Sequence, residues 1–144
     1  MDIGKRIRVL IVDDRAGDLD DLCSFLRLLK RIEIVGTGKN GIELMQKAAA
    51  LRPDLVITGL HIPRMNGLDC TLRLRTVMPD TRFVIFTDLE APFTEAECRV
   101  PGADFYLYKE HMPERIVVAI HRLFPEEFRP DARPASIWKE GVFC

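Results

Sequence analysis

Polar side chains that could bind a metal ion or a phosphoryl group follow several short apolar runs in this sequence. Asp13 and Asp14 come directly after the apolar run Ile7–Val12. Two adjacent carboxylates at the end of a strand repel one another and favour a divalent cation such as Mg²⁺, which prefers oxygen ligands. Taken alone, the pair is explained as well by a solvated turn or a helix cap.

Two further polar residues follow later apolar runs. Thr87 comes after the run 83–86, and its hydroxyl could hydrogen-bond an oxyanion, although threonine is also a common strand residue. Lys109 follows the run Phe105–Tyr108, and its ammonium could pair with a carboxylate or a phosphate, or simply face solvent. Each signal is weak alone. Acids, a hydroxyl and a lysine after three different runs together indicate one shared site.

The apolar runs themselves indicate the elements that would position these residues. Five runs rich in β-branched or aromatic residues show little alternation, which is typical of strands covered on both faces of a parallel sheet. Helical patterns separate them, and this order predicts a doubly wound, three-layer α/β fold. Ligands in such folds bind beyond the carboxyl ends of the strands, where we expect the polar residues to meet. The runs are Ile7–Val12, 32–35, 55–57, 83–86 and Phe105–Tyr108.

The helices predicted between these strands differ in the strength of their signals. Leucines recur at helical spacing in 19–29, and the clearest apolar stripe lies at 113–124. Asn40 followed by Glu43 resembles a capping box at the start of a helix. The segment 94–100 gives the weakest prediction, because it has few apolar residues and is bracketed by prolines.

The composition describes an ordinary soluble domain followed by a short tail. Of the 144 residues 47% are hydrophobic and 30% are charged, which is typical of globular proteins. The 21 basic and 22 acidic residues nearly balance, so there is no electrostatic case for binding nucleic acid or an anionic membrane. Four cysteines without metal-ligand spacing, and a start unlike a signal peptide, favour a cytoplasmic protein. We expect one domain at 1–124 and a proline-containing, poorly ordered tail at 125–144.

Over residues 7–124 the sequence resembles the response-regulator receiver domain of two-component signalling. The resemblance implies the (βα)5 flavodoxin-like receiver fold, built on a five-stranded parallel sheet. It also implies that the rotamer of Tyr106 reports the switch between signalling states. The pattern at 34–36 and 41–43 is most similar to receivers that carry a helix-turn-helix DNA-binding domain. The matching stretches are 9–14, 52–57, 63–67, 84–87 and 102–109.

The same resemblance implies roles for the polar residues at the strand ends. Asp13, Asp14 and the backbone carbonyl of His61 would hold Mg²⁺. Thr87 and Lys109 would contact a phosphoryl group. In the family, an aspartate at the end of the third strand accepts that group from a phosphohistidine or a small phosphodonor.

That aspartate is missing from this sequence. Gly59 stands at the acceptor position, four residues before Pro63, and glycine cannot act as a nucleophile. The change also removes one Mg²⁺ ligand, so Mg²⁺ binding should be weak or absent. Thr58 is expected to point to the opposite face of the strand, and Asp54 lies at its far end. His61 could reach the rim of the pocket, and its phosphorylation would be worth testing.

Two further departures concern the switch and the surface. Asp88 follows Thr87 where the family has a small residue, and it could either add negative charge to the site or cap a turn. We expect Lys109 to pair with Asp14, or with Asp88, and so to hold one fixed switch state. The polar, proline-interrupted stretch 95–101 weakens the face that often mediates dimerisation in the family, which favours a monomer or a weak dimer.

These observations predict a non-enzymatic receiver module of a two-component or phosphorelay system that acts through protein–protein contacts without phosphorylation. Its partner would be a histidine kinase, a phosphotransfer protein or a downstream effector. One alternative is a Mg²⁺-dependent Rossmann-like phosphatase, although such enzymes place two acids two residues apart, whereas Asp13 and Asp14 are adjacent. Another is a normally phosphorylated receiver that was altered at position 59.

Overall fold

The computed structural model describes residues 6–87, 102–110 and 112–127. None of the helices in these ranges is long and apolar enough to cross a bilayer. The helix predicted at 94–100, Asp88 and the tail from 128 onward lie outside the described residues. The elements, in chain order, are β1 (Ile7–Val12), α1 (Ala16–Leu26), β2 (Ile32–Gly38), α2 (Gly41–Leu51), β3 (Leu55–Gly59), α3 (Gly67–Val77), β4 (Arg82–Thr87), β5 (Phe105–Tyr108) and α5 (Met112–Leu123).

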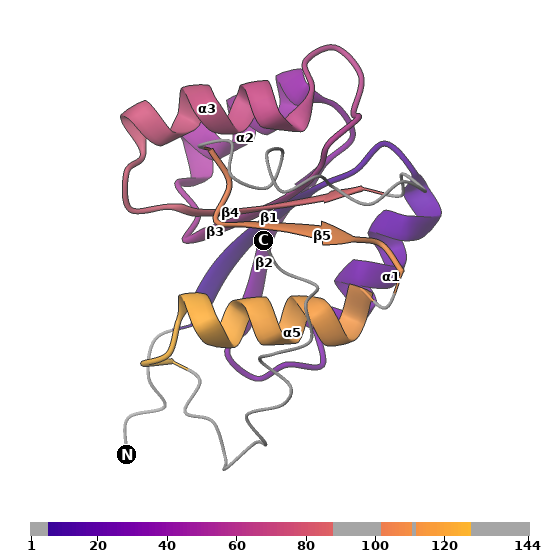
Figure 1. The fold of residues 1–144 in the computed structure, drawn as a ribbon, viewed down its shortest axis with the longest axis vertical. Helices are drawn as coiled ribbons and strands as arrows, with labels where there is room; N and C mark the ends of the chain where they lie inside the picture. The colour runs from indigo at the N-terminus through magenta and orange to yellow at the C-terminus, as the bar shows by residue number, and fades with distance from the viewer. Residues whose placement is uncertain (1–5, 88–101, 111, 128–144) are drawn as a thin grey trace.

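The strands form one parallel sheet in the order β2-β1-β3-β4-β5. Figure 1 shows α2 and α3 on one face of this sheet and α1 and α5 on the other. The predicted doubly wound, three-layer α/β fold is therefore confirmed. The chain order of the strands reverses at β1, so a ligand crevice is expected outside the carboxyl ends of β1 and β3.

Side chains of the central strands alternate between two apolar cores. Val9 and Ile11 of β1 pack beneath α1 and α5, whereas Leu10 and Val12 pack beneath α2 and α3. All four side chains are fully buried. Cover on both faces explains why the sequence of this strand shows no alternation of apolar and polar residues.

Three strands extend further than the apolar pattern predicts, and one of them, β4, gains a single residue at each end. β2 continues to Gly38 and β3 to Gly59, although glycine favours strand conformation weakly. Pairing with neighbours holds both ends in the sheet: Gly38 lies opposite Val12 of β1, and Gly59 lies opposite Phe86 of β4. Position 59 is consequently the last residue of a buried central strand.

Close backbone contacts fix the loop that follows β3. A Cβ atom on Gly67 would stand 2.1 Å from the carbonyl oxygen of Gly59, and one on Gly41 would stand 2.0 Å from that of Met65. Both distances are far below van der Waals contact, so only glycine fits at these two positions. The start of α3 and the start of α2 therefore hold the two ends of this loop.

Asparagine side chains begin two of the helices. The Asn40 side chain accepts a hydrogen bond from the backbone N–H of Glu43 at 2.9 Å, and the Glu43 carboxylate accepts one from the N–H of Lys39 at 3.2 Å. This confirms the predicted capping interaction at α2. Asn66 caps α3 in the same way through the N–H of Asp69 at 2.8 Å.

Replacing Asn40 with alanine should lower the free energy of unfolding by about 1 kcal/mol, because a first-turn N–H loses its acceptor. Urea denaturation followed by circular dichroism would measure the loss. The Asn40→Asp variant keeps an acceptor oxygen and should stay close to the wild type. Equal losses in the two variants would show that the cap does not stabilise α2.

Candidate functional site

A cavity of about 90 Å³ opens at the carboxyl ends of β1, β3, β4 and β5. Parallel strands end at the same edge of a sheet, which is why residues distant in sequence meet there. Its lining contains the predicted site residues other than Tyr106. The described residues that line it are Asp13, Asp14, Arg15, Gly59, Leu60, His61, Phe86, Thr87 and Lys109.

A side chain at position 59 would lie next to Asp13, the residue that follows β1. The three atoms nearest to a Cβ built on Gly59 would be Ile62 Cγ2 at 3.2 Å, Asp13 Oδ1 at 3.4 Å and Phe86 Cε2 at 3.9 Å. A longer side chain at this position would thus start beside Asp13, within the lining of the cavity. Position 59 therefore lines the cavity and offers no side-chain atom to it.

Lys109 is held by two carboxylates. Its Nζ donates to Asp13 Oδ2 at 3.0 Å and to Asp18 Oδ2 at 2.7 Å. The Asp13 side chain is only 3% exposed and that of Lys109 is 19% exposed, so much of this contact is shielded from water. The backbone N–H of Lys109 also donates to the carbonyl oxygen of Thr87 at 2.9 Å. One ammonium therefore joins the end of β5 to both β1 and α1.

The predicted pairing of Lys109 with Asp14 is wrong. The backbone N–H of Asp13 donates to the carbonyl oxygen of Gly38, which keeps Asp13 in the sheet with its side chain inside. Asp14 follows the last of these sheet contacts and is exposed. The other predicted partner, Asp88, lies outside the described residues.

Burial and charge shift the pKa values of the paired groups. Burial raises the pKa of Asp13 above its ordinary value, although the hydrogen bond and the charge of Lys109 act to lower it. Burial alone would lower the pKa of Lys109, but the hydrogen bonds and charges of Asp18 and Asp13 outweigh it, so that pKa is raised. Lys109 therefore carries its positive charge at neutral pH.

The residues present fit Mg²⁺ poorly. Within the described ranges, no three His, Cys, Asp or Glu side chains are grouped so that they could hold a metal ion. Gly59 supplies no carboxylate, and the Asp13 carboxylate already accepts from Lys109. Mg²⁺ requires near-octahedral oxygen coordination, which Asp14 and backbone carbonyls alone would have to complete.

The other predicted residues lie in different surroundings. His61 is exposed at the rim of the cavity, and Thr87 is buried in its lining. Tyr106 is buried opposite Ile85 in the sheet, and this burial raises the pKa of its hydroxyl. The Thr58 hydroxyl donates to the carbonyl oxygen of its neighbour Gly59 at 3.1 Å. The roles expected for these residues in binding a phosphoryl group or reporting a switch stay predictions.

Asp18 is the site residue that sequence reasoning missed. From the sequence alone, the helix dipole is a sufficient explanation for acids at the start of this helix, because it favours negative charge there. The signal that could have found Asp18 is its position in the first turn of the helix that follows β1, since this turn lies at the same sheet edge as Lys109.

Comparison with known proteins decides the family. The family model for the response regulator receiver domain matches residues 9–121. The chain belongs to this family. The match begins within β1 and ends within α5, so it covers nearly all of the elements in the described part of the chain.

Relatives of two kinds resemble this receiver domain. The transcriptional regulatory protein LnrK of Bacillus subtilis is 30% identical over 114 residues, which are 79% of this chain and 52% of LnrK. The chemotaxis protein CheY of Thermotoga maritima is 28% identical over 123 residues, which are 81% of this chain and 96% of CheY. The chain thus spans about half the length of the first relative and nearly all of the second.

Solved structures show the same fold. The receiver domain of NarL from Mycobacterium tuberculosis superposes with a TM-score of 0.75 at 22% identity, covering 83% of this chain and 96% of that domain. A LuxR-family response regulator from Aurantimonas superposes with a TM-score of 0.76 at 20% identity, covering 94% and 95%. These likenesses establish the architecture of this receiver domain.

Proposed function

We propose that this receiver domain signals without phosphorylation at the family's usual position and that it acts through contacts with another protein. The observation that carries the proposal is Gly59 at the end of β3, where the missing side chain would point at the Asp13 carboxylate. Because glycine has no nucleophilic side chain, no residue at this position can attack the phosphorus of a phosphodonor.

The residues near Gly59 are poorly suited to accept a phosphoryl group in place of an aspartate. The Asp13 carboxylate is buried and hydrogen-bonded to Lys109, which reduces its nucleophilicity. Thr58 directs its hydroxyl to a backbone carbonyl. His61 lies exposed at the rim, where water surrounds it.

The contacts of Lys109 support a switch state that does not depend on phosphate. A lysine that contacts an incoming phosphoryl group must have its ammonium available, whereas this one donates to Asp13 and Asp18. These two ion pairs link Lys109, which follows β5, to Asp18 in α1 and to Asp13 after β1. We expect these elements to stay in this arrangement until a partner or ligand competes for the carboxylates.

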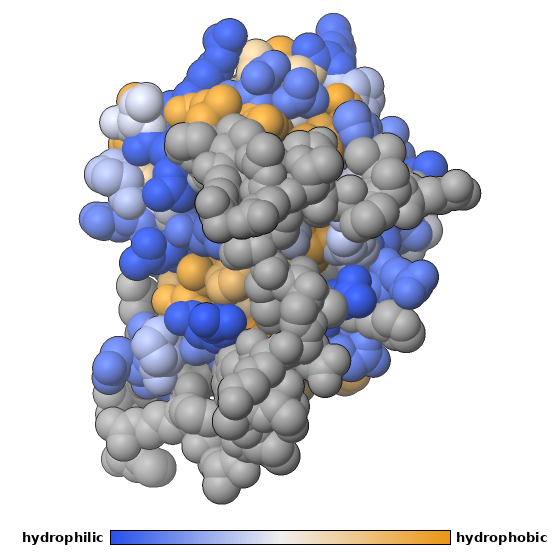
Figure 2. Space-filling view, in the orientation of Figure 1, coloured by the Kyte–Doolittle hydropathy of each residue, from blue (hydrophilic) through white to orange (hydrophobic). Residues whose placement is uncertain are grey.

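The surface supports a role in protein contact. Helices α2 and α3 expose the apolar side chains of Ile42, Leu72 and Val77, with Val77 65% exposed. Figure 2 shows hydrophobic colouring in the upper part of the molecule, where these helices lie. A contiguous exposed apolar patch is a common property of binding sites for partners, and we infer such a site on these two helices. A histidine kinase, a phosphotransfer protein and a downstream effector are the partner classes that fit a receiver domain.

Incubating the purified chain with acetyl phosphate and Mg²⁺ and weighing it intact tests the proposal. We expect the mass to stay unchanged, because Gly59 offers no acceptor oxygen. A typical receiver domain with its aspartate serves as the positive control in the same reaction. A gain of one phosphoryl group, mapped to Asp13 or His61, would overturn the proposal.

A further inference from the structure

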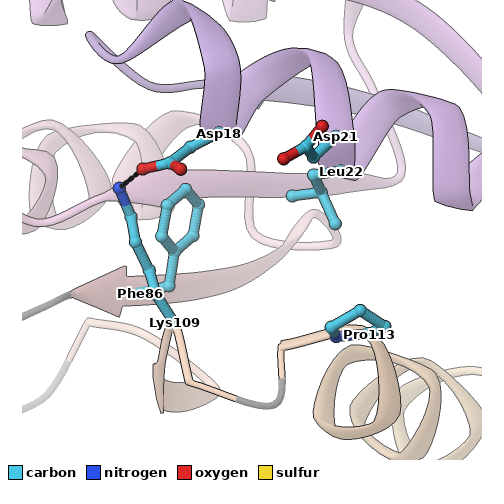
Figure 3. A pocket seen from close by; sticks show the side chains of 6 residues that line it. All are labelled: Asp18, Asp21, Leu22, Phe86, Lys109 and Pro113. Atoms are coloured by element: carbon cyan, nitrogen blue, oxygen red, sulfur yellow. Dashed lines mark hydrogen bonds and ion pairs between the residues drawn. The ribbon is translucent and has the colours of Figure 1, made fainter.

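A second cavity, of about 220 Å³, adjoins the first and lies between α1, the ends of β4 and β5, and the start of α5. Figure 3 shows the side chains around it, with Asp18 and Asp21 on α1 facing Phe86, Lys109 and Pro113 across the opening. Leu22, Phe86 and Pro113 supply apolar walls. The described residues that line it are Asp18, Asp21, Leu22, Phe86, Lys109 and Pro113.

The charges around this cavity favour a positively charged guest. Among the described lining residues, the two carboxylates of Asp18 and Asp21 outnumber the one ammonium of Lys109, which also donates to Asp13. Asp21 is exposed, and within the described part of the chain no hydrogen bond or ion pair reaches its carboxylate. A carboxylate is an acceptor only, so Asp21 has room for a charged donor.

The aromatic wall favours the same charge. The Lys109 Nζ lies 5.3 Å from the centroid of the Phe86 ring, which shows that the ring already accommodates a cation nearby. The cavity is smaller than the sites of drug-sized molecules, and a cavity of about 150 Å³ is enough for a benzene ring. The guest that fits is therefore small, with a compact apolar body.

We propose that this cavity binds a small organic cation, an amine or a guanidinium on a short apolar body. Its charge pairs with Asp18 and Asp21, and its apolar body packs against Leu22, Phe86 and Pro113. An anion would be repelled by the two carboxylates, and a neutral molecule of the same shape would lack the ion pair.

The bound cation also acts on the first cavity, a step that rests on the proposed phosphate-independent function. Phe86 and Lys109 line both cavities. A cation beside Asp18 competes with Lys109 Nζ for this carboxylate, and Lys109 then keeps only Asp13. The ion pair between Lys109 and Asp18 of α1 is then lost. Binding of the cation would in this way change the switch state of the receiver domain, as phosphorylation does in the family.

Titration of the ¹⁵N-labelled full chain with phenethylamine tests the site by NMR. We expect saturable shifts of the amide signals of Leu22, Phe86 and Lys109, and shifts that spread to Asp13 and Gly59 in the first cavity. 2-Phenylethanol, which has the same ring and no charge, should bind at least about threefold more weakly, and phenylacetate should give no saturable shift. Equal binding of the amine and the alcohol, or no saturation with the amine, would overturn the site. Shifts confined to the second cavity would overturn the coupling.

A matched pair of variants separates this site from general attraction to an acidic helix. Asp21→Asn should raise the dissociation constant for phenethylamine about three- to fivefold, because one ion pair is lost at an exposed position. Asp20→Asn removes the same charge one residue away, at an exposed position outside the lining, and should leave the constant nearly unchanged. Equal weakening by the two variants would contradict the proposal.

The two proposals fail in different ways. A chain that binds phenethylamine and also gains a phosphoryl group would overturn phosphate-independent signalling and leave the cation site standing. A chain that gains no phosphoryl group and binds the amine no better than the alcohol would overturn the cation site alone.

Discussion

Replacing Gly59 with aspartate should turn a chain that gains no phosphoryl group from acetyl phosphate and Mg²⁺ into one that gains one per molecule. The new carboxylate would leave the chain beside Asp13, where it supplies both the missing nucleophile and a ligand for Mg²⁺. Thr87 and Lys109 already stand in the same lining. Intact-mass measurement over time, with and without Mg²⁺, would show the change.

The backbone tolerates this substitution. Gly59 does not have a positive φ angle, and the nearest atom to its new Cβ would be Ile62 Cγ2 at 3.2 Å, so Ile62 has to shift by a few tenths of an ångström. Mg²⁺ should raise the melting temperature of this variant more than that of the wild type, because only the variant has the added ligand.

The matched control is Gly59→Asn, which has nearly the same shape and no carboxylate. It should fold as the aspartate variant does and gain no phosphoryl group. If the aspartate variant folds normally and stays unmodified, the pocket has lost more than its acceptor. If the asparagine variant is modified, another residue carries the phosphoryl group.

Replacing Lys109 with methionine should lower the free energy of unfolding by about 3 kcal/mol at neutral pH. The substitution leaves the buried Asp13 carboxylate without its cation, and breaking such a pair by removing one partner costs more than the pair itself contributes. The contact with Asp18 contributes less, because the Asp18 side chain is 43% exposed. Urea denaturation of the two proteins would measure the difference.

The effect of Lys109→Met should depend on pH in a defined direction. Burial raises the folded-state pKa of Asp13 above its unfolded value, so this group contributes stability at low pH and loses it as the pH rises through the folded pKa. Removing Lys109 removes interactions that lower this pKa, so the pKa rises further. The destabilisation should therefore shrink as the pH falls from about 7 to about 4.

Two variants test this explanation. The double variant Asp13→Asn, Lys109→Met removes the buried charge together with its partner and should recover part of the lost stability. Lys47→Met changes a lysine whose side chain is 43% exposed and should cost less than about 1 kcal/mol. A loss from Lys109→Met that is no larger than that from Lys47→Met, or that is the same at every pH, would show that the Lys109–Asp13 contact is not what stabilises this edge of the sheet.

The sequence predicts the fold well because burial leaves a direct pattern in it. β1 and β5 have the predicted bounds, since apolar and aromatic residues dominate both of them. The ends of β2, β3 and β4 were missed because they carry no apolar signal, and their strand conformation comes from pairing with neighbours. The residues at these ends are Gly38, Gly59, Arg82 and Thr87. Pairing across a sheet depends on contacts distant in sequence, which a local pattern does not contain.

The sequence predicts which residues line the cavity, but it does not predict the hydrogen bonds between them. Parallel strands end at the same edge of the sheet, so the sequence alone predicts that Asp13, Thr87 and Lys109 lie close together. Which acid accepts from Lys109 depends on how far α1 reaches over the sheet edge and on the direction of each side chain after Val12. These distances are set by tertiary packing, and no spacing in the sequence encodes them.

The two glycines that lie against carbonyl oxygens hold the loop after β3 independently of the residue at position 59. Gly41 and Gly67 hold the loop after β3 in place whatever stands at its start, so the surroundings of a catalytic carboxylate persist without it. Some glycine codons differ from an aspartate codon by a single base. A single base change at the Gly59 codon could therefore place a carboxylate in an otherwise unchanged pocket, whereas a side chain at Gly41 or Gly67 would deform the loop.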